Sequence, residues 1–212
     1  VFNTPDAPTQ AVAELTIAHM LNSLRHISTT DSNMRSGKWT PTMGSLLATK
    51  TVGLIGVGRI GSAVAKLAQA FGARVIGFDP VVSSHSSVEL LSLDEVLNQA
   101  DIVSLHVPIN DQTHHIVNAS AISRMKPGSI VVNVSRGGLI DESALHDALK
   151  SQHLSGAALD CFEDEPYSGP LLQIPGVHVT AHMGSYARET RDLMEVEAST
   201  NLVNGLRKRG LI

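Results

Sequence analysis

The chain has 212 residues, of which 42% are hydrophobic and 3% aromatic, and 16 Lys and Arg against 20 Asp and Glu give a formal net charge of −4. The single cysteine excludes an internal disulfide framework and a cysteine-rich metal site, and the mild acidity argues against a general nucleic-acid-binding surface. No uninterrupted apolar run approaches the roughly 18 residues of a membrane span, so we expect neither membrane nor nucleic acid as a partner.

The first residues, Val1-Phe2-Asn3, lack an initiator Met, and we interpret this as the sign of a fragment of a longer protein. The length suits one large domain or two small ones. No basic segment followed by an apolar one opens the chain, so we expect no secretory leader. Together with the low cysteine count, this favours a cytoplasmic protein.

Two long helices are predicted, one near each end of the chain. The first covers about residues 9–27, the second covers about residues 185–206, and both have apolar side chains at helical spacing. The polar segment 28–50 that follows the first helix is predicted to be a connecting loop. Each helix is longer than a crossover helix needs to be. They either cap the sheet, or link this domain to another domain or to a second subunit.

Between these helices, short apolar segments alternate with amphipathic ones. The apolar segments largely lack polar alternation, which is typical of strands buried on both faces. The predicted strands cover residues 51–55, 74–78, 102–106, 129–133, 156–160 and 177–180, and the predicted helices cover 60–71, 93–99, 119–124 and 142–150. Ser92 with Glu95 predicts a capping box, and Asp141 predicts an N-cap. The alternation predicts an α/β fold of Rossmann type, a doubly wound parallel sheet with helices on both faces.

A glycine-rich turn, Gly56-Val-Gly-Arg-Ile-Gly61, follows the first predicted strand and opens an amphipathic helix. This context is what a G-x-G-x-x-G pattern needs to indicate dinucleotide binding. Gly56 permits the tight turn, Gly58 lets a pyrophosphate approach the backbone, and Gly61 lets the helix pack closely. The helix amides and dipole would face the phosphates. The alternative is a plain glycine turn beside a surface acid.

The next predicted strand ends at Asp79-Pro80, about 20 residues after the last glycine of the turn. A carboxylate here can accept hydrogen bonds from both hydroxyls of an adenosine ribose and would repel a 2′-phosphate. Residues 75–123 contain no Lys or Arg that could bind such a phosphate. The sequence therefore predicts NAD rather than NADP.

Three later segments, 132–141, 158–166 and 178–185, place polar residues after predicted strands, at the edge where open parallel sheets bind ligands. With them the chain resembles the D-isomer-specific 2-hydroxyacid dehydrogenases, and among these it is most similar to the D-3-phosphoglycerate dehydrogenases. The resemblance covers nearly the whole chain, and its motifs are Asn3-Thr-Pro5, Ala11-Val-Ala-Glu14, Gly37-Lys-Trp39, the glycine turn, Leu105-His-Val-Pro108, Ser135-Arg-Gly137, Asp160 with Glu165-Pro166, and His182-x-Gly184. It implies an NAD-dependent oxidoreductase that transfers a hydride between nicotinamide and a small D-2-hydroxy or 2-oxo acid. One candidate substrate is 3-phosphoglycerate, in serine biosynthesis.

The resemblance implies catalytic roles for three residues. Arg136 would hold the substrate carboxylate and carbonyl, since a guanidinium can bind a carboxylate through two parallel hydrogen bonds. His182 would be the general acid/base, and Glu165 would pair with it. A histidine with an ordinary pKa of about 6.5 can take or give a proton near neutral pH, and an adjacent carboxylate fixes its tautomer.

The resemblance also implies contacts with NAD, and it implies no metal site. Asp160 matches the residue that binds the nicotinamide carboxamide; alternatively it only ends a strand. The implied cofactor-binding residues are Gly56, Gly58, Arg59, Ile60, Gly61, Asp79, Pro80, His106, Val107, Pro108, Thr113, Val134, Ser135, Arg136, Asp160, His182 and Gly184.

Several side chains have alternative interpretations. Arg136 and Glu165 could form a structural ion pair, and Cys161 could be a small core residue or a thiol near the nicotinamide. His114-His115 resembles a metal-binding pair, but no acid or cysteine clusters with it in sequence, so we expect a surface loop. Ala181 stands where the family usually has Pro, which relaxes the backbone before His182.

The resemblance places the family's substrate domain before Val1. We therefore expect residues 1–212 to form one NAD-binding domain with linking helices near 9–27 and 185–206, without a separate substrate domain. Such a chain would bind NAD with reduced affinity and show little turnover, because the absent domain closes the cleft against water. An alternative is an NAD(H)-sensing protein of corepressor type, which can keep the same Arg, Glu and His. The family commonly dimerises through this domain, so the resemblance also implies a homodimer.

Overall fold

The computed structural model of the chain describes residues 3–211, so Val1, Phe2 and Ile212 lie outside the described residues. Within this part, seven parallel strands form one sheet in the order β3-β2-β1-β4-β5-β6-β7. The strands are β1 (Thr51–Ile55), β2 (Arg74–Phe78), β3 (Glu89–Leu90), β4 (Ile102–Leu105), β5 (Ser129–Asn133), β6 (Leu154–Leu159) and β7 (Val177–Val179). The strand order reverses between β1 and β4, which confirms the predicted doubly wound sheet.

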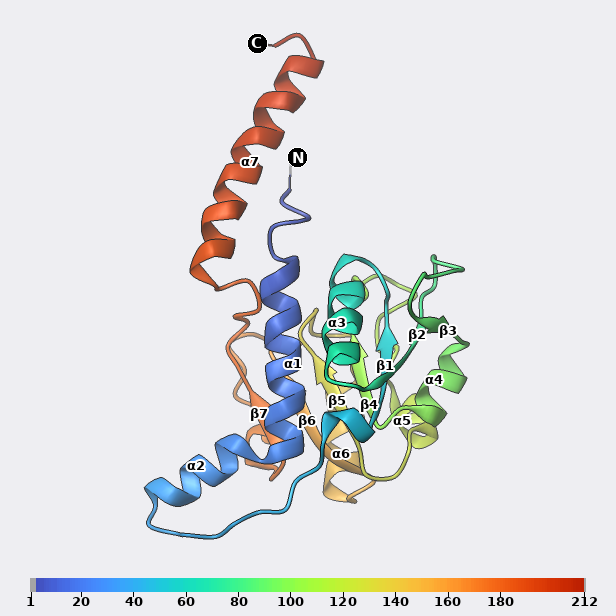
Figure 1. Ribbon diagram of the computed structural model, residues 1–212, viewed down its shortest axis with the longest axis vertical. Helices are drawn as coiled ribbons and strands as arrows, with labels where there is room; N and C mark the ends of the chain where they lie inside the picture. The colour runs from blue at the N-terminus through green and yellow to red at the C-terminus, as the bar shows by residue number, and fades with distance from the viewer. Residues whose placement is uncertain (1–2, 212) are drawn as a thin grey trace.

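Helices cover both faces of this sheet, as predicted (Figure 1). The helices are α1 (Thr9–Arg25), α2 (Ile27–Arg35), α3 (Arg59–Ala70), α4 (Leu93–Gln99), α5 (Ala119–Arg124), α6 (Glu142–Lys150) and α7 (Arg188–Lys208), with short 3₁₀ helices η1 (Leu47–Thr49) and η2 (Pro170–Gln173). Helices α1 and α3 contribute to the hydrophobic cluster on one face, and α4, α5 and α6 contribute to the cluster on the other.

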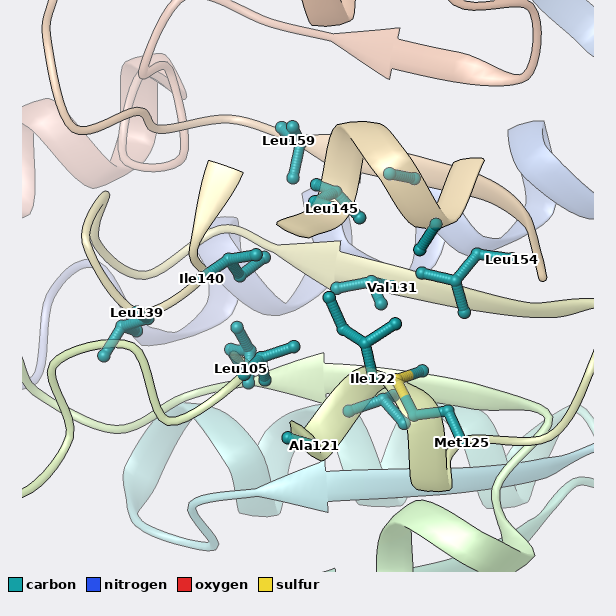
Figure 2. Close-up of a cluster of buried hydrophobic side chains, with 14 of the residues drawn as sticks. Leu105, Ala121, Ile122, Met125, Val131, Leu139, Ile140, Leu145, Leu154 and Leu159 are labelled. Carbon is teal, nitrogen blue, oxygen red and sulfur yellow. The ribbon is translucent and has the colours of Figure 1, made fainter. Parts of the chain in front are cut away.

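The two hydrophobic clusters explain why the strands lack polar alternation. On the α5 and α6 face, Leu105 and Val131 of the sheet lie among Ile122 of α5, Met125 directly after α5 and Leu145 of α6, and all five are buried (Figure 2). The opposite face buries side chains of α1 and α3 against β1 and β5. Because each strand has a hydrophobic layer on both sides, removing apolar surface from water stabilises the sheet by about 1.5–3 kcal/mol for each fully buried aliphatic side chain.

The predicted strands and crossover helices occupy their expected positions to within two residues at each end. The Ser92–Glu95 capping box is present, and the Asp141 carboxylate accepts the N–H of Ala144 at 3.0 Å. The sequence analysis missed β3, because a two-residue edge strand is too short to leave a periodic pattern.

The region after the first helix differs from the prediction. Helix α1 ends at Arg25, since His26 adopts the left-handed conformation (φ 55°) and turns the chain into α2. The prediction of a loop over 28–50 is therefore wrong for the residues of α2. This helix has no buried residue, so it carries no apolar stripe that the sequence could display. An exposed ion pair between Asp31 and Arg35, 2.8 Å apart, supports it.

The two long helices have different surroundings. Helix α1 buries eight side chains and caps the sheet. Helix α7 projects away from the sheet (Figure 1) and buries only Thr190, with apolar side chains such as Leu193, Val196 and Leu202 exposed. Its contacts with the N-terminal segment include a hydrogen bond of 2.9 Å from the Ala7 N–H to Glu197. Among the helices of residues 3–211, none has the length and hydrophobicity required to cross a membrane.

Candidate functional site

The glycine turn lies at the carboxyl end of β1, beside the reversal of strand order. Gly56 has φ 101°, and a Cβ there would lie 2.7 Å from the backbone of His106. A Cβ on Gly61 would lie 2.1 Å from the carbonyl oxygen of Gly56, so α3 packs directly against the turn. A Cβ on Gly58 would meet nothing within 4 Å. The backbone is therefore open at Gly58, where α3 begins and its first amides can bind an anion.

Asp79 at the end of β2 is held firmly against this turn. Its Oδ2 accepts the Val57 N–H at 2.8 Å, and its Oδ1 accepts the N–H groups of Val81 and Val82, each at 2.9 Å. Burial acts to raise the pKa of this carboxyl, but the three amide hydrogen bonds outweigh it and leave the pKa below its ordinary value. Oδ2 retains a lone pair for a further hydrogen-bond donor, whereas Oδ1 already accepts two bonds.

A cleft of about 430 Å³ lies beside α1, between the glycine turn and the carboxyl ends of β5 and β6. Seven of the predicted cofactor-binding residues line it: Ile60, Val134, Ser135, Arg136, Asp160, His182 and Gly184. The cleft also has lining residues that the sequence analysis did not select as site residues: Asn3, Thr4, Pro5, Pro8, Val12, Ser185 and Met194. The fold thus gathers residues from both ends of the chain around one hollow.

His182 and Glu165 form a close pair at this cleft. His182 Nδ1 lies 3.0 Å from Oε1 and 2.8 Å from Oε2 of Glu165. Burial acts to raise the pKa of Glu165, but hydrogen bonds from His182 and from the Phe162 N–H outweigh it and hold the pKa below its ordinary value. The carboxylate therefore stays ionised at neutral pH, and because it pairs with Nδ1, Nε2 of the imidazole is left for contact with a ligand.

Arg136 follows β5 and is exposed at the cleft. Its Nη1 donates to the carbonyl oxygen of Ser135 at 2.6 Å. Within the described residues it forms no ion pair with Glu165, which pairs with His182 instead. The alternative of a structural Arg136–Glu165 ion pair is thus not what the structure contains, and the guanidinium keeps donors for a carboxylate ligand.

Asp160 follows β6 and organises the segment that carries His182. Only 1% of Asp160 is exposed, and its carboxylate accepts the Thr180 hydroxyl at 2.5 Å and the N–H groups of Met183 and Gly184 at 2.9 and 2.8 Å. These bonds hold the backbone on both sides of His182, whose φ of 50° is left-handed. The chain adopts this conformation with Ala181 at the position where a Pro was expected. Asp160 therefore does more than end a strand.

His19 of α1 completes this network from the other side. Its Nε2 lies 3.1 Å from the Thr180 hydroxyl oxygen. Burial lowers the pKa of His19, with a smaller opposing effect from Asp160, so the ring is neutral at pH 7. Because the Thr180 hydroxyl donates to Asp160, it accepts a hydrogen from Nε2 of His19. The sequence analysis missed both residues, since no local pattern links position 19 to position 180.

Ten of the predicted cofactor residues do not line this cleft, and four of these ten lie in or beside the segment after β4. Val107 is buried in the core and Pro108 is exposed. The Thr113 hydroxyl donates to the Pro108 carbonyl at 2.6 Å and closes the loop between them. His106 lies under the glycine turn, where its Nε2 meets the Ser104 hydroxyl at 2.9 Å and burial lowers its pKa to about 3. These residues support the turn and the loop in the structure.

Two more predicted cofactor residues, Arg59 and Pro80, lie near the glycine turn, and the role of the single cysteine was left open by the sequence. Arg59 pairs with Asp6 at 2.5 Å, so its side chain ties the N-terminal segment to the turn, and Pro80 is exposed. Cys161 is 3% exposed, and burial raises the pKa of its thiol to about 12. The thiol is therefore a small core residue and not a reactive group.

Comparisons with known proteins agree with this architecture. The family model described as "D-isomer specific 2-hydroxyacid dehydrogenase, NAD binding domain" matches residues 17–184. A D-3-phosphoglycerate dehydrogenase of Methanocaldococcus jannaschii is 43% identical over 199 residues, 90% of this chain and 38% of that protein. A hydroxypyruvate reductase of Thermotoga maritima is 41% identical over 204 residues, 93% of this chain and 67% of that protein.

Solved structures show the same arrangement. The crystal structure of a glyoxylate reductase from Paecilomyes thermophila matches with a TM-score of 0.92 and 35% identity, covering 97% of this chain and 64% of that one. The chain thus spans less than half the length of the first curated relative and about two thirds of the length of the other two proteins.

Proposed function

Because the chain belongs to the D-isomer specific 2-hydroxyacid dehydrogenases and matches their NAD-binding domain, we propose that it forms the NAD-binding part of an oxidoreductase acting on a small D-2-hydroxy acid. The observation that carries this proposal is the His182–Glu165 pair beside Arg136, at a cleft that reaches from the glycine turn to the end of β6. Bound NAD supplies the hydride acceptor or donor, and the protein residues supply the proton transfer and the substrate contacts.

His182 is the proposed general acid/base. With its Nδ1 facing Glu165, the ring offers Nε2 to the substrate hydroxyl during oxidation and returns the proton to the carbonyl during reduction. The ionised Glu165 stabilises the imidazolium that forms and fixes the tautomer between turnovers. Arg136 holds the substrate carboxylate through parallel hydrogen bonds, so that the reacting carbon is oriented.

The cofactor site is proposed to follow the carboxyl edge of the sheet. Gly58 and the first amides of α3 hold the pyrophosphate, because the backbone there is open. Asp79 accepts a ribose hydroxyl, which favours NAD over NADP. Asp160 lies at the cleft and is proposed to contact the nicotinamide carboxamide with a lone pair that Thr180, Met183 and Gly184 leave unused.

The substrate is proposed to be a small 2-oxo or 2-hydroxy acid. The relatives bear the names D-3-phosphoglycerate dehydrogenase, hydroxypyruvate reductase and glyoxylate reductase. Arg136 is the one Arg or Lys among the described residues that line the cleft. A phosphorylated substrate such as 3-phosphohydroxypyruvate would need further cations from outside these lining residues, whereas hydroxypyruvate and glyoxylate would not. Serine biosynthesis is the role to expect only if the phosphorylated substrate is used.

Fluorescence titration with NADH, followed by reduction assays with these three 2-oxo acids, tests the proposal. We expect NADH to bind, and we expect His182→Ala to keep that binding while lowering kcat at least ~100-fold, the scale of general acid/base catalysis. Glu165→Gln should lower kcat less and shift its pH dependence. A chain that binds no NADH, or a His182→Ala variant with unchanged kcat, contradicts it.

An NAD-binding module with little turnover is the second candidate. The side chains of His182 and Glu165 are 47% and 37% exposed, so water reaches a pair whose electrostatic effect depends on its exclusion. NADH binding without reduction of any of the three acids would favour this candidate, including a sensing role of corepressor type.

We also propose a homodimer that forms through the exposed apolar side chains of α7, and light scattering can test this oligomeric state. The cytoplasmic location stays a prediction.

A further inference from the structure

A group of three metal-ligating side chains lies outside the cleft, where two loops meet. His114 and His115 belong to the loop after β4, and Glu163 belongs to the loop after β6. One donor atom from each of the three lies within 4.8 Å of the other two. The sequence analysis predicted a plain surface loop here because the acid comes from a segment 48 residues further along the chain.

We propose that His114, His115 and Glu163 form a binding site for one divalent transition-metal ion of the zinc class. Two imidazoles with one carboxylate is a donor set that suits Zn²⁺, whereas Mg²⁺ and Ca²⁺ prefer oxygen ligands alone. Three protein ligands leave the fourth position of a tetrahedral ion to water. The site is distinct from the proposed catalytic residues and does not depend on the proposed dehydrogenase activity.

The positions of the donor atoms suit such an ion after small movements. Metal–ligand distances of about 2.0–2.2 Å in a tetrahedral site place neighbouring donor atoms roughly 3.3 Å apart. His115 Nε2 and a Glu163 oxygen already touch, and the His114 and His115 rings stack with centroids 3.9 Å apart. His114 and Glu163 are exposed, so their side chains can rotate without disturbing the core. Rotation of Glu163 can lengthen its contact with His115, and rotation of His114 can bring its donor nitrogen closer to the other two donor atoms.

The backbone around the three residues is fixed by one segment, 137–142, that lies between the two loops. The His115 N–H donates to the Gly138 carbonyl at 2.7 Å, and the Glu163 N–H donates to the Glu142 carboxylate at 2.9 Å. A Cβ on Gly137 would lie 1.8 Å from the Phe162 carbonyl oxygen, so the loop after β6 is pressed onto this segment. The backbone that carries the ligands is thus held in place before any ion arrives, and only side-chain rotations remain to be ordered, which limits the entropic cost of binding.

The backbone of His115 is also unusual. Its φ of 49° is left-handed, a conformation that is unfavourable for a residue other than glycine. The His115 ring stacks on that of His114, and its Nε2 lies against Glu163. Glu142 adds negative charge beside the three residues, since its carboxyl interacts electrostatically with Glu163, Asp164 and His115. Imidazole nitrogens next to several carboxylates form an environment that attracts a cation.

The test is calorimetric titration of the metal-free chain with ZnCl₂, repeated with Co²⁺ as a spectroscopic probe. His115→Asn removes the imidazole but keeps a side chain that tolerates positive φ, and Glu163→Gln keeps the shape while removing the charge. We expect each variant to bind Zn²⁺ at least ~10-fold more weakly and His115→Asn to lose the visible Co²⁺ band of a four-coordinate site. Zn²⁺ should also raise the Tm of the wild type more than that of either variant.

His146→Asn is the matched control, since His146 also lies beside a carboxylate, that of Asp147 at 3.3 Å, but among residues 3–211 it belongs to no group of three metal-ligating side chains. It should bind Zn²⁺ like the wild type. His114→Ala gives an independent measurement if one of the other variants unfolds. The proposal is overturned if the wild type takes up no Zn²⁺, or if the His114, His115 and Glu163 variants bind it as tightly as the His146→Asn control.

Discussion

The hydroxyl of Thr180 connects α1 to the segment that carries His182, and we expect its removal to lower the free energy of unfolding by a measurable amount. In Thr180→Val, the Asp160 carboxylate loses a donor at 2.5 Å, and Nε2 of His19 loses its acceptor at 3.1 Å. Leaving a buried polar group without a partner costs about 1–3 kcal/mol, and the amides of Met183 and Gly184 still bind Asp160. We therefore expect destabilisation by about 2 kcal/mol.

Urea unfolding followed by circular dichroism measures this effect, and a loss of that size corresponds to a decrease in Tm of roughly 4–8 °C. Thr180→Ser keeps the hydroxyl and should stay close to the wild type. The double variant His19→Leu/Thr180→Val should lose less stability than the sum of the losses in the two single variants, because it has no buried His19 N–H left without an acceptor. A Thr180→Val variant as stable as Thr180→Ser would refute this account of the network.

Three further predictions concern the glycine turn and its support. Asp79→Ala should weaken NADH binding and relax discrimination against NADPH in fluorescence titrations; unchanged preference would remove Asp79 from the ribose site. Gly61→Ala places a Cβ 2.1 Å from a backbone oxygen and should cost about 1–3 kcal/mol, whereas Gly58→Ala meets open space and should impair NADH binding with little loss of stability. Burial holds the pKa of His106 at about 3 in the folded state against 6.5 ordinarily. The stability that depends on neutral His106 is therefore fully present above pH 6.5 and is lost by ~1.4 kcal/mol per pH unit as the pH falls from 6.5 to about 3, so unfolding of His106→Leu should take up one proton fewer in this range.

Local sequence patterns determined the sheet and its crossover helices. Apolar runs such as those around β1 and β5 identify strands buried on both faces, and the glycine spacing at 56–61 marks the turn between β1 and α3. These features depend on residues close together in the chain, and so they can be predicted from it. Helix α2 was not predicted for a related reason: it buries no side chain, so its sequence has no periodic apolar stripe to indicate a helix.

The pairings across the sheet edge depended on tertiary structure. His182 meets Glu165, and Thr180 meets both Asp160 and His19, because parallel strands bring their carboxyl ends to one edge while α1 packs across the same face. The resemblance to the dehydrogenase family suggested the first pairing, but nothing in the sequence indicates the contact between Thr180 and His19.

The sequence by itself determined the fold class, the position of the glycine turn and which side chains are suited to the proposed chemistry, since each follows from short-range periodicity and residue type. Only the tertiary structure decided that Cys161 is buried and unreactive and that Glu163 joins two histidines from another loop. Burial and contacts between distant segments depend on how the strands and helices pack, and that packing is set by the whole hydrophobic core.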